Sequence, residues 1–187
     1  AVYDRIALRD STEGIVAEVV MKERPLSGLK LRENPLILVL ESVEKPGNLG
    51  AVLRTADAAD ADAVIICDPL TDLYNPNLIR ASLGAIFTRQ VAAATSGEAI
   101  KWLKDNNIKI YTAQLQDTSW YCDTDITCGT TIVIGTEYTG LSDVWRMAAD
   151  AHVKIPMLGS LDSLNVSVSA AILAFEAVRQ RQGGAGR

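Results

Sequence analysis

The sequence lacks the patterns that mark several common classes of protein. It has no apolar run near the roughly 20 residues that cross a bilayer. Its first residues lack the basic and apolar regions of a signal peptide. No GxGxxG follows a strand-like run and no GxxxxGKS/T occurs, so a dinucleotide fold and a P-loop have little support. We therefore expect a cytoplasmic protein without a membrane partner.

Histidine and cysteine are also scarce. The only histidine, His152, lies at the start of an apolar run, where a capping or packing role is favoured over catalysis. The cysteines Cys67, Cys122 and Cys128 are odd in number and lack CxxC spacing, so neither a disulfide framework nor a metal site is expected. A single histidine leaves no Ser-His-Asp or Cys-His set to build.

The chain has few basic residues for a nucleic-acid binder. Lys and Arg number 18 against 23 Asp and Glu, a formal net charge of −5. This balance argues against strong unaided RNA affinity, although it leaves room for a local basic patch. With 187 residues, 48% apolar and 22% charged, the chain suits one α/β core. It begins without methionine, and we expect it to be one domain of a longer protein.

Short apolar runs alternate with helical patterns along most of the chain. The run Leu36–Leu40 is typical of a parallel strand that is buried on both faces. The expected strands are 36–40, 63–67, 87–93, 108–113, 132–134 and 153–157. The expected helices are 49–59, 75–85, 96–106 with Ser96 as N-cap, and 165–181. This alternation predicts an α/β fold with a mostly parallel sheet flanked by helices.

The two ends of the chain are less regular, apart from the final predicted helix. In that helix Val168, Ile172 and Phe175 form an apolar stripe that is well equipped to pack, against the core or a second subunit. The first 31 residues are irregular, with a short strand near residues 14–20. The glycine-rich tail 183–187 is expected to fray.

Polar residues gather where two expected strands end. One strand stops at Gly135 and leads into a turn, and a second leads into a loop rich in Gly, Ser and Asp. Since strand ends and their loops carry sites in α/β proteins, we expect one site here. Its candidate residues are Asn48, Arg54, Glu137, Ser163 and Asn165.

Each candidate also has a structural interpretation. Arg54 lies among alanines and leucine, and an arginine pressed against packed surface needs a carboxylate or phosphate partner, so an ion pair with Asp57 or Glu137 is an alternative. Asn48 would cap a helix that starts at Leu49, and Glu137 would be an ordinary turn acid. Ser163 and Asn165 would cap the final helix.

The chain contains three ordered motifs, ESVEKPGNLGAVLRTA, IGTEYTGL and KIPMLGSLDSLNVSVSAA. They resemble the motifs of the SpoU-type (TrmH-like) RNA ribose methyltransferases of the SPOUT superfamily. A further segment, LYNPNLIRASLGAIF, is similar to one that the family carries between the first two. The resemblance runs from about Leu36 to Arg181, with the expected order and separations.

The resemblance implies a fold and a cofactor. Family members thread the C-terminal segment, here Ile132–Phe175, through a loop to form a deep trefoil knot. The knot loops bind S-adenosylmethionine in a bent form, largely through backbone groups. By motif match the cofactor-binding residues are Gly135, Thr136, Gly140, Ile155, Met157 and Leu164.

The implied reaction is methylation of a ribose 2′-hydroxyl in structured RNA, ribosomal RNA first and transfer RNA second, without a metal. The residues Asn48, Arg54, Glu137, Ser163 and Asn165 fall on the family's active-site positions. Family proposals make the arginine a general base, but a group with a pKa above about 12 is a poor base at neutral pH. We expect Arg54 to clamp a phosphate instead.

Two departures from the family accompany this resemblance. Tyr138 stands where many members have glycine, so an aromatic ring would line or crowd the mouth of the cofactor site. Residues 1–31 are too short for the N-terminal RNA-binding domain of many members, so the methyltransferase domain is expected at 32–182. The resemblance also implies a homodimer that pairs through the knotted region.

Three other functions stay open at this point. They are a knotted methyltransferase that modifies a base, an RNA-binding or assembly module that has lost catalysis, and a nucleotide-binding oxidoreductase. The motif SLN and the pair Asn48 and Arg54 favour ribose as the acceptor, and a module that only binds has no chemical need for all the polar candidates.

Overall fold

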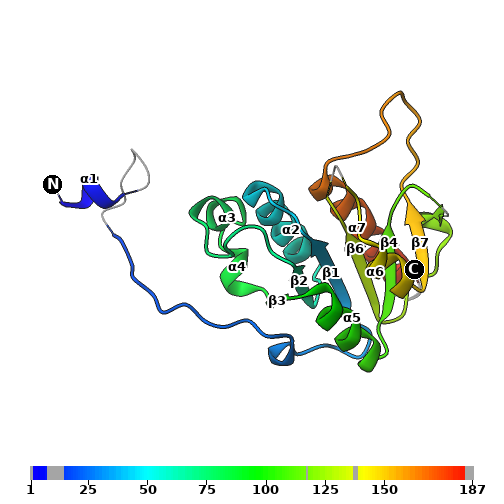
Figure 1. Ribbon diagram of the computed structural model, residues 1–187, viewed down its shortest axis with the longest axis horizontal. Helices are drawn as coiled ribbons and strands as arrows, with labels where there is room; N and C mark the ends of the chain where they lie inside the picture. Colours follow the sequence, from blue (N-terminus) through cyan, green and yellow to red (C-terminus); the bar gives the residue numbers. More distant parts are fainter. Residues whose placement is uncertain (1, 8–14, 117, 137–138, 184–187) are drawn as a thin grey trace.

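A sheet of seven parallel strands forms the centre of the computed structural model, which describes residues 2–7, 15–116, 118–136 and 139–183. The strand order is β3-β2-β1-β6-β4-β7-β5 (Figure 1). The strands are β1 (Leu36–Glu41), β2 (Ala63–Cys67), β3 (Val91–Ala94), β4 (Lys109–Ala113), β5 (Ser119–Trp120), β6 (Thr130–Ile134) and β7 (Ala151–Lys154). The predicted parallel α/β fold is confirmed.

Helices cover both faces of this sheet. One face packs against α2 (Pro46–Ala58), α3 (Pro76–Ala81), α4 (Ala85–Thr88) and α7 (Val166–Gly183). The other face packs against α5 (Ser96–Asp105) and α6 (Asp143–Ala148). The remaining helical turns are α1 (Val2–Ile6), η1 (Leu26–Gly28) and η2 (Tyr121–Asp123). Since each face buries apolar side chains, the central strands β1 and β6 are apolar at most positions, with Glu41, Thr130 and Thr131 as buried polar exceptions.

Alternate side chains of strand β1 pack against the helices on opposite faces of the sheet. Leu38 and Leu40 belong to the apolar cluster that includes α2 and α7, whereas Ile37 and Val39 belong to the cluster with α5 and α6. All four side chains are fully buried. Truncating one of them, such as Leu38, to alanine would cost about 2–5 kcal/mol.

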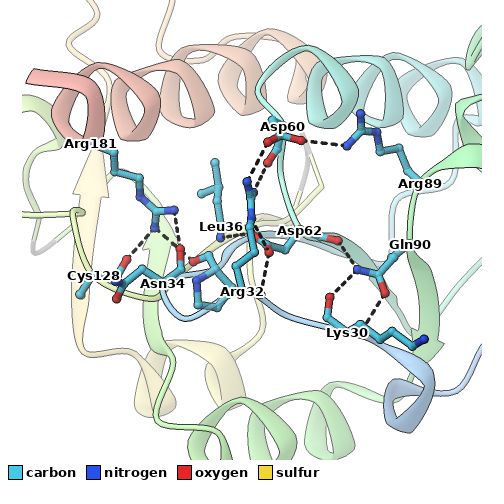
Figure 2. A network of polar contacts seen from close by, with 11 residues as sticks. Lys30, Arg32, Asn34, Leu36, Asp60, Asp62, Arg89, Gln90, Cys128 and Arg181 are labelled. Atoms are coloured by element: carbon cyan, nitrogen blue, oxygen red, sulfur yellow. Dashed lines mark hydrogen bonds and ion pairs between the residues drawn. The ribbon is translucent and has the colours of Figure 1, made fainter. Parts of the chain in front are cut away.

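The edge of the sheet where the strands begin, the amino edge, is held by a network of paired charges (Figure 2). The buried carboxylate of Asp62 accepts from Arg32 Nε at 2.9 Å and from the Leu36 N–H at 2.9 Å. Burial alone would raise the pKa of Asp62, but these hydrogen bonds outweigh it and hold the pKa below its usual range. Arg89 pairs with Asp57 at 2.6 Å and with Asp60 at 3.2 Å.

The end of α7 is anchored at the same edge. Arg181 donates to the carbonyl oxygens of Asn34 at 3.0 Å and Cys128 at 2.6 Å (Figure 2). These carbonyls precede β1 and β6, so one side chain joins the C-terminal helix to two central strands. Burial lowers the pKa of Arg181. Across the sheet Lys109, which begins β4, pairs with Asp150 at 2.8 Å.

The N-terminal segment leaves the body of the molecule (Figure 1). The strand expected near residues 14–20 is wrong for its described part, because residues 15–20 are exposed and outside any strand or helix. Contact with the body is present from Lys22 onward, where its carbonyl accepts from Tyr74 at 3.0 Å. Arg24 also donates to Tyr74 at 2.9 Å. The domain boundary near residue 31 stays a prediction.

Two helix predictions are wrong in detail. The helix expected at 75–85 is broken into α3 and α4, because Leu83 at φ 51 and Gly84 at φ 87 adopt left-handed backbone conformations. The strand expected from residue 87 begins at Val91 because α4 occupies its first two positions. Thr95, rather than Ser96, caps α5 through a capping box with Glu98.

Helix α7 also packs differently from the prediction. It contacts the core through Ala170, Leu173 and Ala177, which are buried. The expected stripe is largely exposed instead, with Val168 at 45% and Phe175 at 47% of full exposure. An apolar face of α7 therefore has no cover among the described residues. The trefoil knot stays a prediction, as does the fraying of the tail, of which only Gly183 is described.

Candidate active site

Two adjoining cavities lie where the parallel strands end, at the edge opposite the charge network. The first cavity, of about 380 Å³, is lined by the segments that follow β4, β6 and β7 and by the start of α7. The second, of about 310 Å³, is lined by the segments that follow β1 and β2. They share Thr136, Thr139 and Val166. This is the place where open parallel α/β sheets bind ligands.

The first cavity brings together every residue that the motifs assign to the cofactor. Those lining residues are Gly135, Thr136, Gly140, Ile155, Met157 and Leu164. Ser163, expected in the active site, also lines it, and its hydroxyl donates to Asp162 at 3.2 Å. The two strand-end segments that were expected to form one site therefore line a single cavity.

The wall at Gly135 depends on a close approach of two backbones. Thr136 and Gly140 exchange hydrogen bonds of 3.3 and 3.2 Å and so close the turn. A Cβ at Gly135 would lie 2.2 Å from the Gly140 carbonyl oxygen, so no side chain fits there. Gly140 itself has φ 66, a conformation that glycine adopts without strain. Both glycines are therefore needed to shape this part of the cavity.

Sequence reasoning missed several lining residues. Gln114 to Gln116 follow β4 and form one rim, and three charged side chains, Arg146, Lys154 and Asp162, line the cavity as well. Arg146 reaches Asp143 only at 4.0 Å. Gln114 directly follows the strand expected at 108–113, which was an available signal, whereas Lys154 lies inside the strand expected at 153–157. Arg146 lies on a helix and carried none.

The second cavity places Asn48 beside the first. Asn48 Oδ1 accepts a hydrogen bond from Asn165 Nδ2 at 3.2 Å, across 117 positions of sequence. Asn165 Oδ1 accepts from the Ser167 N–H at 2.9 Å, so Asn165 caps α7, as one interpretation predicted. The expectation that Asn48 is an N-cap is wrong, because α2 already begins at Pro46 and Lys45 is its N-cap.

The other two polar candidates are placed differently. Arg54 lies on α2 with an exposed side chain and lines neither cavity, so the idea that it presses against packed surface is wrong. Its expected partner Asp57 instead accepts from Arg89. Glu137 lies outside the described residues, as does Tyr138. Their predicted roles therefore stay predictions.

A buried polar network holds the loop between β6 and α6 in place. Glu41, at the end of β1, accepts from the Ser142 N–H at 2.8 Å and from its hydroxyl. On the same side Ser96 donates to Asp68 at 2.6 Å and accepts from Trp145 Nε1 at 2.9 Å. The loop that includes Gly140 is thereby tied to β1, so the wall of the first cavity is anchored to the centre of the sheet.

A metal site and a membrane-spanning helix are both absent from the described residues. No group of His, Cys, Asp and Glu side chains in that part of the chain is arranged to hold a metal ion. No helix there is long and apolar enough to cross a membrane. His152 contacts Thr112 through Nδ1 at 2.6 Å within the sheet, in agreement with a packing role.

Fold and site together define an open parallel α/β protein with two adjoining cavities at its carboxyl edge, one of them walled by a glycine turn. The sequence model of the SpoU rRNA Methylase family matches residues 35–175. The chain therefore belongs to this family, as the motifs indicated.

Curated relatives agree with this assignment. A 23S rRNA (uridine(2479)-2′-O)-methyltransferase of Streptomyces viridochromogenes is 35% identical over 91% of this chain and 61% of its own length. The 23S rRNA (guanosine-2′-O-)-methyltransferase RlmB of Photobacterium profundum is 38% identical over 92% of this chain and 73% of its own. The chain thus spans about three fifths of the first of these proteins.

Solved structures show the same likeness. An RNA 2′-O ribose methyltransferase superposes with a TM-score of 0.85 and 42% identity, over 97% of this chain and 70% of the other. The SpoU methyltransferase AviRb from Streptomyces viridochromogenes, in complex with the cofactor AdoMet, gives 0.83 and 33% identity. That match covers 88% of this chain and 67% of AviRb.

Proposed function

We propose that this chain transfers a methyl group from S-adenosylmethionine to a ribose 2′-hydroxyl of structured RNA, ribosomal RNA first and transfer RNA second. The observation that carries the proposal is the first cavity, which all six motif-assigned cofactor residues line. The Asn48–Asn165 hydrogen bond lies beside it, because Val166, which follows Asn165, lines both cavities. The named relatives act on 23S ribosomal RNA, which sets the order of substrates.

The first cavity suits S-adenosylmethionine in size and lining. Its volume lies in the range of small-molecule sites, and Ile155, Met157 and Leu164 offer apolar contact to an adenosyl group. Arg146 and Asp162 add one charge of each sign, which matches the carboxylate and ammonium of a methionyl group. When bound, the cofactor supplies an electrophilic methyl group, and no metal is needed.

The polar residues of the site then position the acceptor. Asn165 is fixed by its own helix cap and by Asn48, so the two amides form a preorganised pair that orients the ribose. Arg54, exposed on α2, is placed to hold an RNA phosphate. As the 2′-oxygen bonds to the methyl carbon and the carbon–sulfur bond breaks, the hydroxyl proton passes to water.

A homodimer remains our proposal for the assembly. The exposed stripe of Val168 and Phe175 on α7 supports it, since apolar side chains of this size on one helix face favour a partner surface. The acidic net charge fits a protein whose RNA affinity comes partly from assembly or from further domains. A cytoplasmic location also stays a prediction.

Calorimetric titration with S-adenosylhomocysteine, followed by transfer of tritiated methyl groups to unmodified transcripts of ribosomal and transfer RNA, tests the function. We expect binding and a label that nuclease digestion places in a 2′-O-methyl nucleotide. Leu164→Arg should weaken binding about 100-fold by filling the cavity, whereas Met147→Arg on exposed α6 should not. Label in a base, or a folded chain that binds no cofactor, would refute the proposal.

A further inference from the structure

Apart from the shared Thr136, no residue that the motifs assign to the cofactor lines the second cavity, which adjoins the first. Its lining combines the segment Ser42–Lys45 after β1, Asn48 on α2 and Leu70 after β2. We infer that this second cavity seats the acceptor nucleotide of the RNA, with the base against Leu70 and Val43 and a phosphate at Lys45. The inference rests on the proposed function and deepens it.

The shared wall carries the first step of this argument. Direct methyl transfer requires the acceptor oxygen and the donor methyl group to meet at contact distance. Among the described residues, Thr136, Thr139 and Val166 line both cavities, so a nucleotide in the second cavity lies next to the first. Asn48 lines the second cavity and accepts a hydrogen bond from Asn165. The two amides therefore lie on the side of the proposed acceptor nucleotide.

The chemistry of the lining carries the second step. Leu70 is 59% exposed and offers an apolar side chain on which the flat face of a base can lie, and Val43, which is only 3% exposed, also lines the cavity. Lys45 is exposed at the mouth and provides a compact positive charge for a phosphate, whereas the neighbouring Glu44 disfavours a free, doubly charged phosphate. A phosphodiester within RNA suits this mixed charge better.

The walls of the second cavity are also rigid on the strand side. Ser42 has φ 51 and turns the chain immediately after β1, and its N–H donates to the Cys67 carbonyl at 2.9 Å. Val43 is buried in the core cluster that includes α2. The segment Ser42–Lys45 is therefore held by the sheet, so the cavity is preformed rather than dependent on RNA for its shape.

Methyl NMR of the leucine and valine side chains tests the inference on the full chain. The dinucleoside monophosphates UpU and GpG, each with one phosphodiester, are titrated in the presence of saturating S-adenosylhomocysteine, with uridine as the probe that lacks phosphate. We expect saturable shifts at Val43 and Leu70, and none at Leu115, which lines the first cavity only. Lys45→Met should weaken the dinucleoside monophosphates several-fold and leave uridine unchanged.

Matched variants decide whether the second cavity is responsible. Leu70→Asp should abolish the shifts, whereas Leu83→Asp, at a similarly exposed leucine that lines neither cavity, should retain them. Equal nucleotide affinity in both variants, or no saturable shift at Val43, would overturn the inference even if S-adenosylhomocysteine binds. Absence of S-adenosylhomocysteine binding would refute the proposed function itself.

Discussion

The two edges of the sheet use their charged side chains in opposite ways. At the amino edge Arg32, Asp62 and Arg89 are joined in ion pairs, and Arg181 is occupied by backbone carbonyls. At the carboxyl edge Glu41 is paired with Ser142, but two cavities open beside it, and among the described residues Arg146 reaches an acidic partner, Asp143, only at 4.0 Å. One edge holds the strands together, and the other leaves charge available for a ligand.

This division indicates which property, stability or ligand affinity, a substitution at each edge should change. Every strand of a parallel sheet points the same way, so its loops fall into two sets that share one core but no contacts. Changes at the amino edge are expected to alter the free energy of unfolding and leave ligand affinity intact. Changes at the carboxyl edge are expected to do the reverse.

The largest expected effect is on catalysis at Arg54. Arg54→Ala should lower methyl transfer by about 10²–10³-fold, because it removes the charge that holds a phosphate in the transition state. Affinity for S-adenosylhomocysteine should stay within about twofold, and the free energy of unfolding within about 0.5 kcal/mol, because the side chain is exposed. Single-turnover kinetics and calorimetry measure these quantities. Arg80→Ala, at an exposed arginine on α3, is the control, and unchanged turnover in Arg54→Ala would sink the assignment.

The second-largest expected effect is a loss of folding stability on substitution at the amino edge. Asp62→Asn should cost about 2–3 kcal/mol at neutral pH, because the buried side chain loses a charged acceptor for Arg32 and the Leu36 N–H. The pKa of Asp62 is lowered in the folded state, so its contribution is present above the ordinary value of 3.8 and is lost as pH falls through the folded pKa. Denaturant unfolding from neutral to acid pH checks this.

The exposed pair Lys101–Asp105 on α5 supplies the control for that experiment. Asp105→Asn should change the free energy of unfolding by less than about 0.5 kcal/mol, because both partners are solvated. Cofactor affinity should be the same in both variants. A loss of affinity in Asp62→Asn without a loss of stability would mean that the two edges are not separate.

The smallest expected effect concerns how the cofactor is oriented. Arg146→Met should weaken S-adenosylhomocysteine about three- to fivefold and leave 5′-methylthioadenosine unchanged, because only the former has a carboxylate for the guanidinium. Calorimetry of both ligands on both proteins measures the difference, with Arg80→Met as the control. Equal losses for the two ligands would place the amino-acid end elsewhere.

Much of the fold could be predicted because the central strands consist mostly of apolar residues. The strand at Ala63–Cys67 has the predicted bounds, and β1 extends the prediction by one residue. The break between α3 and α4 could not be seen, because Leu83 adopts a left-handed conformation that its side chain does not favour. Gly84 alone gave no clear signal against a helical pattern.

The site was predictable where chemistry depends on the backbone and less so where it depends on side-chain direction. A Cβ at Gly135 would clash with the Gly140 carbonyl, and Gly140 has a positive φ, so their motif identifies their place. Arg54 was expected to be covered, yet a helix turns by about 100° per residue and a small error in register exposes a side chain. The same reason explains why Val168 and Phe175 face outward.

The hydrogen bonds of Arg181 also indicate when the fold can be completed while the chain is being synthesised. Asn48 is synthesised 117 residues before Asn165, and Asn34 is synthesised 147 residues before Arg181. Contacts this far apart close late, since a long loop must be ordered first. Strand β1 and helix α2 therefore emerge from the ribosome long before α7 can pack against them. During that interval the apolar face of α2 is open to chaperones and the site does not yet exist.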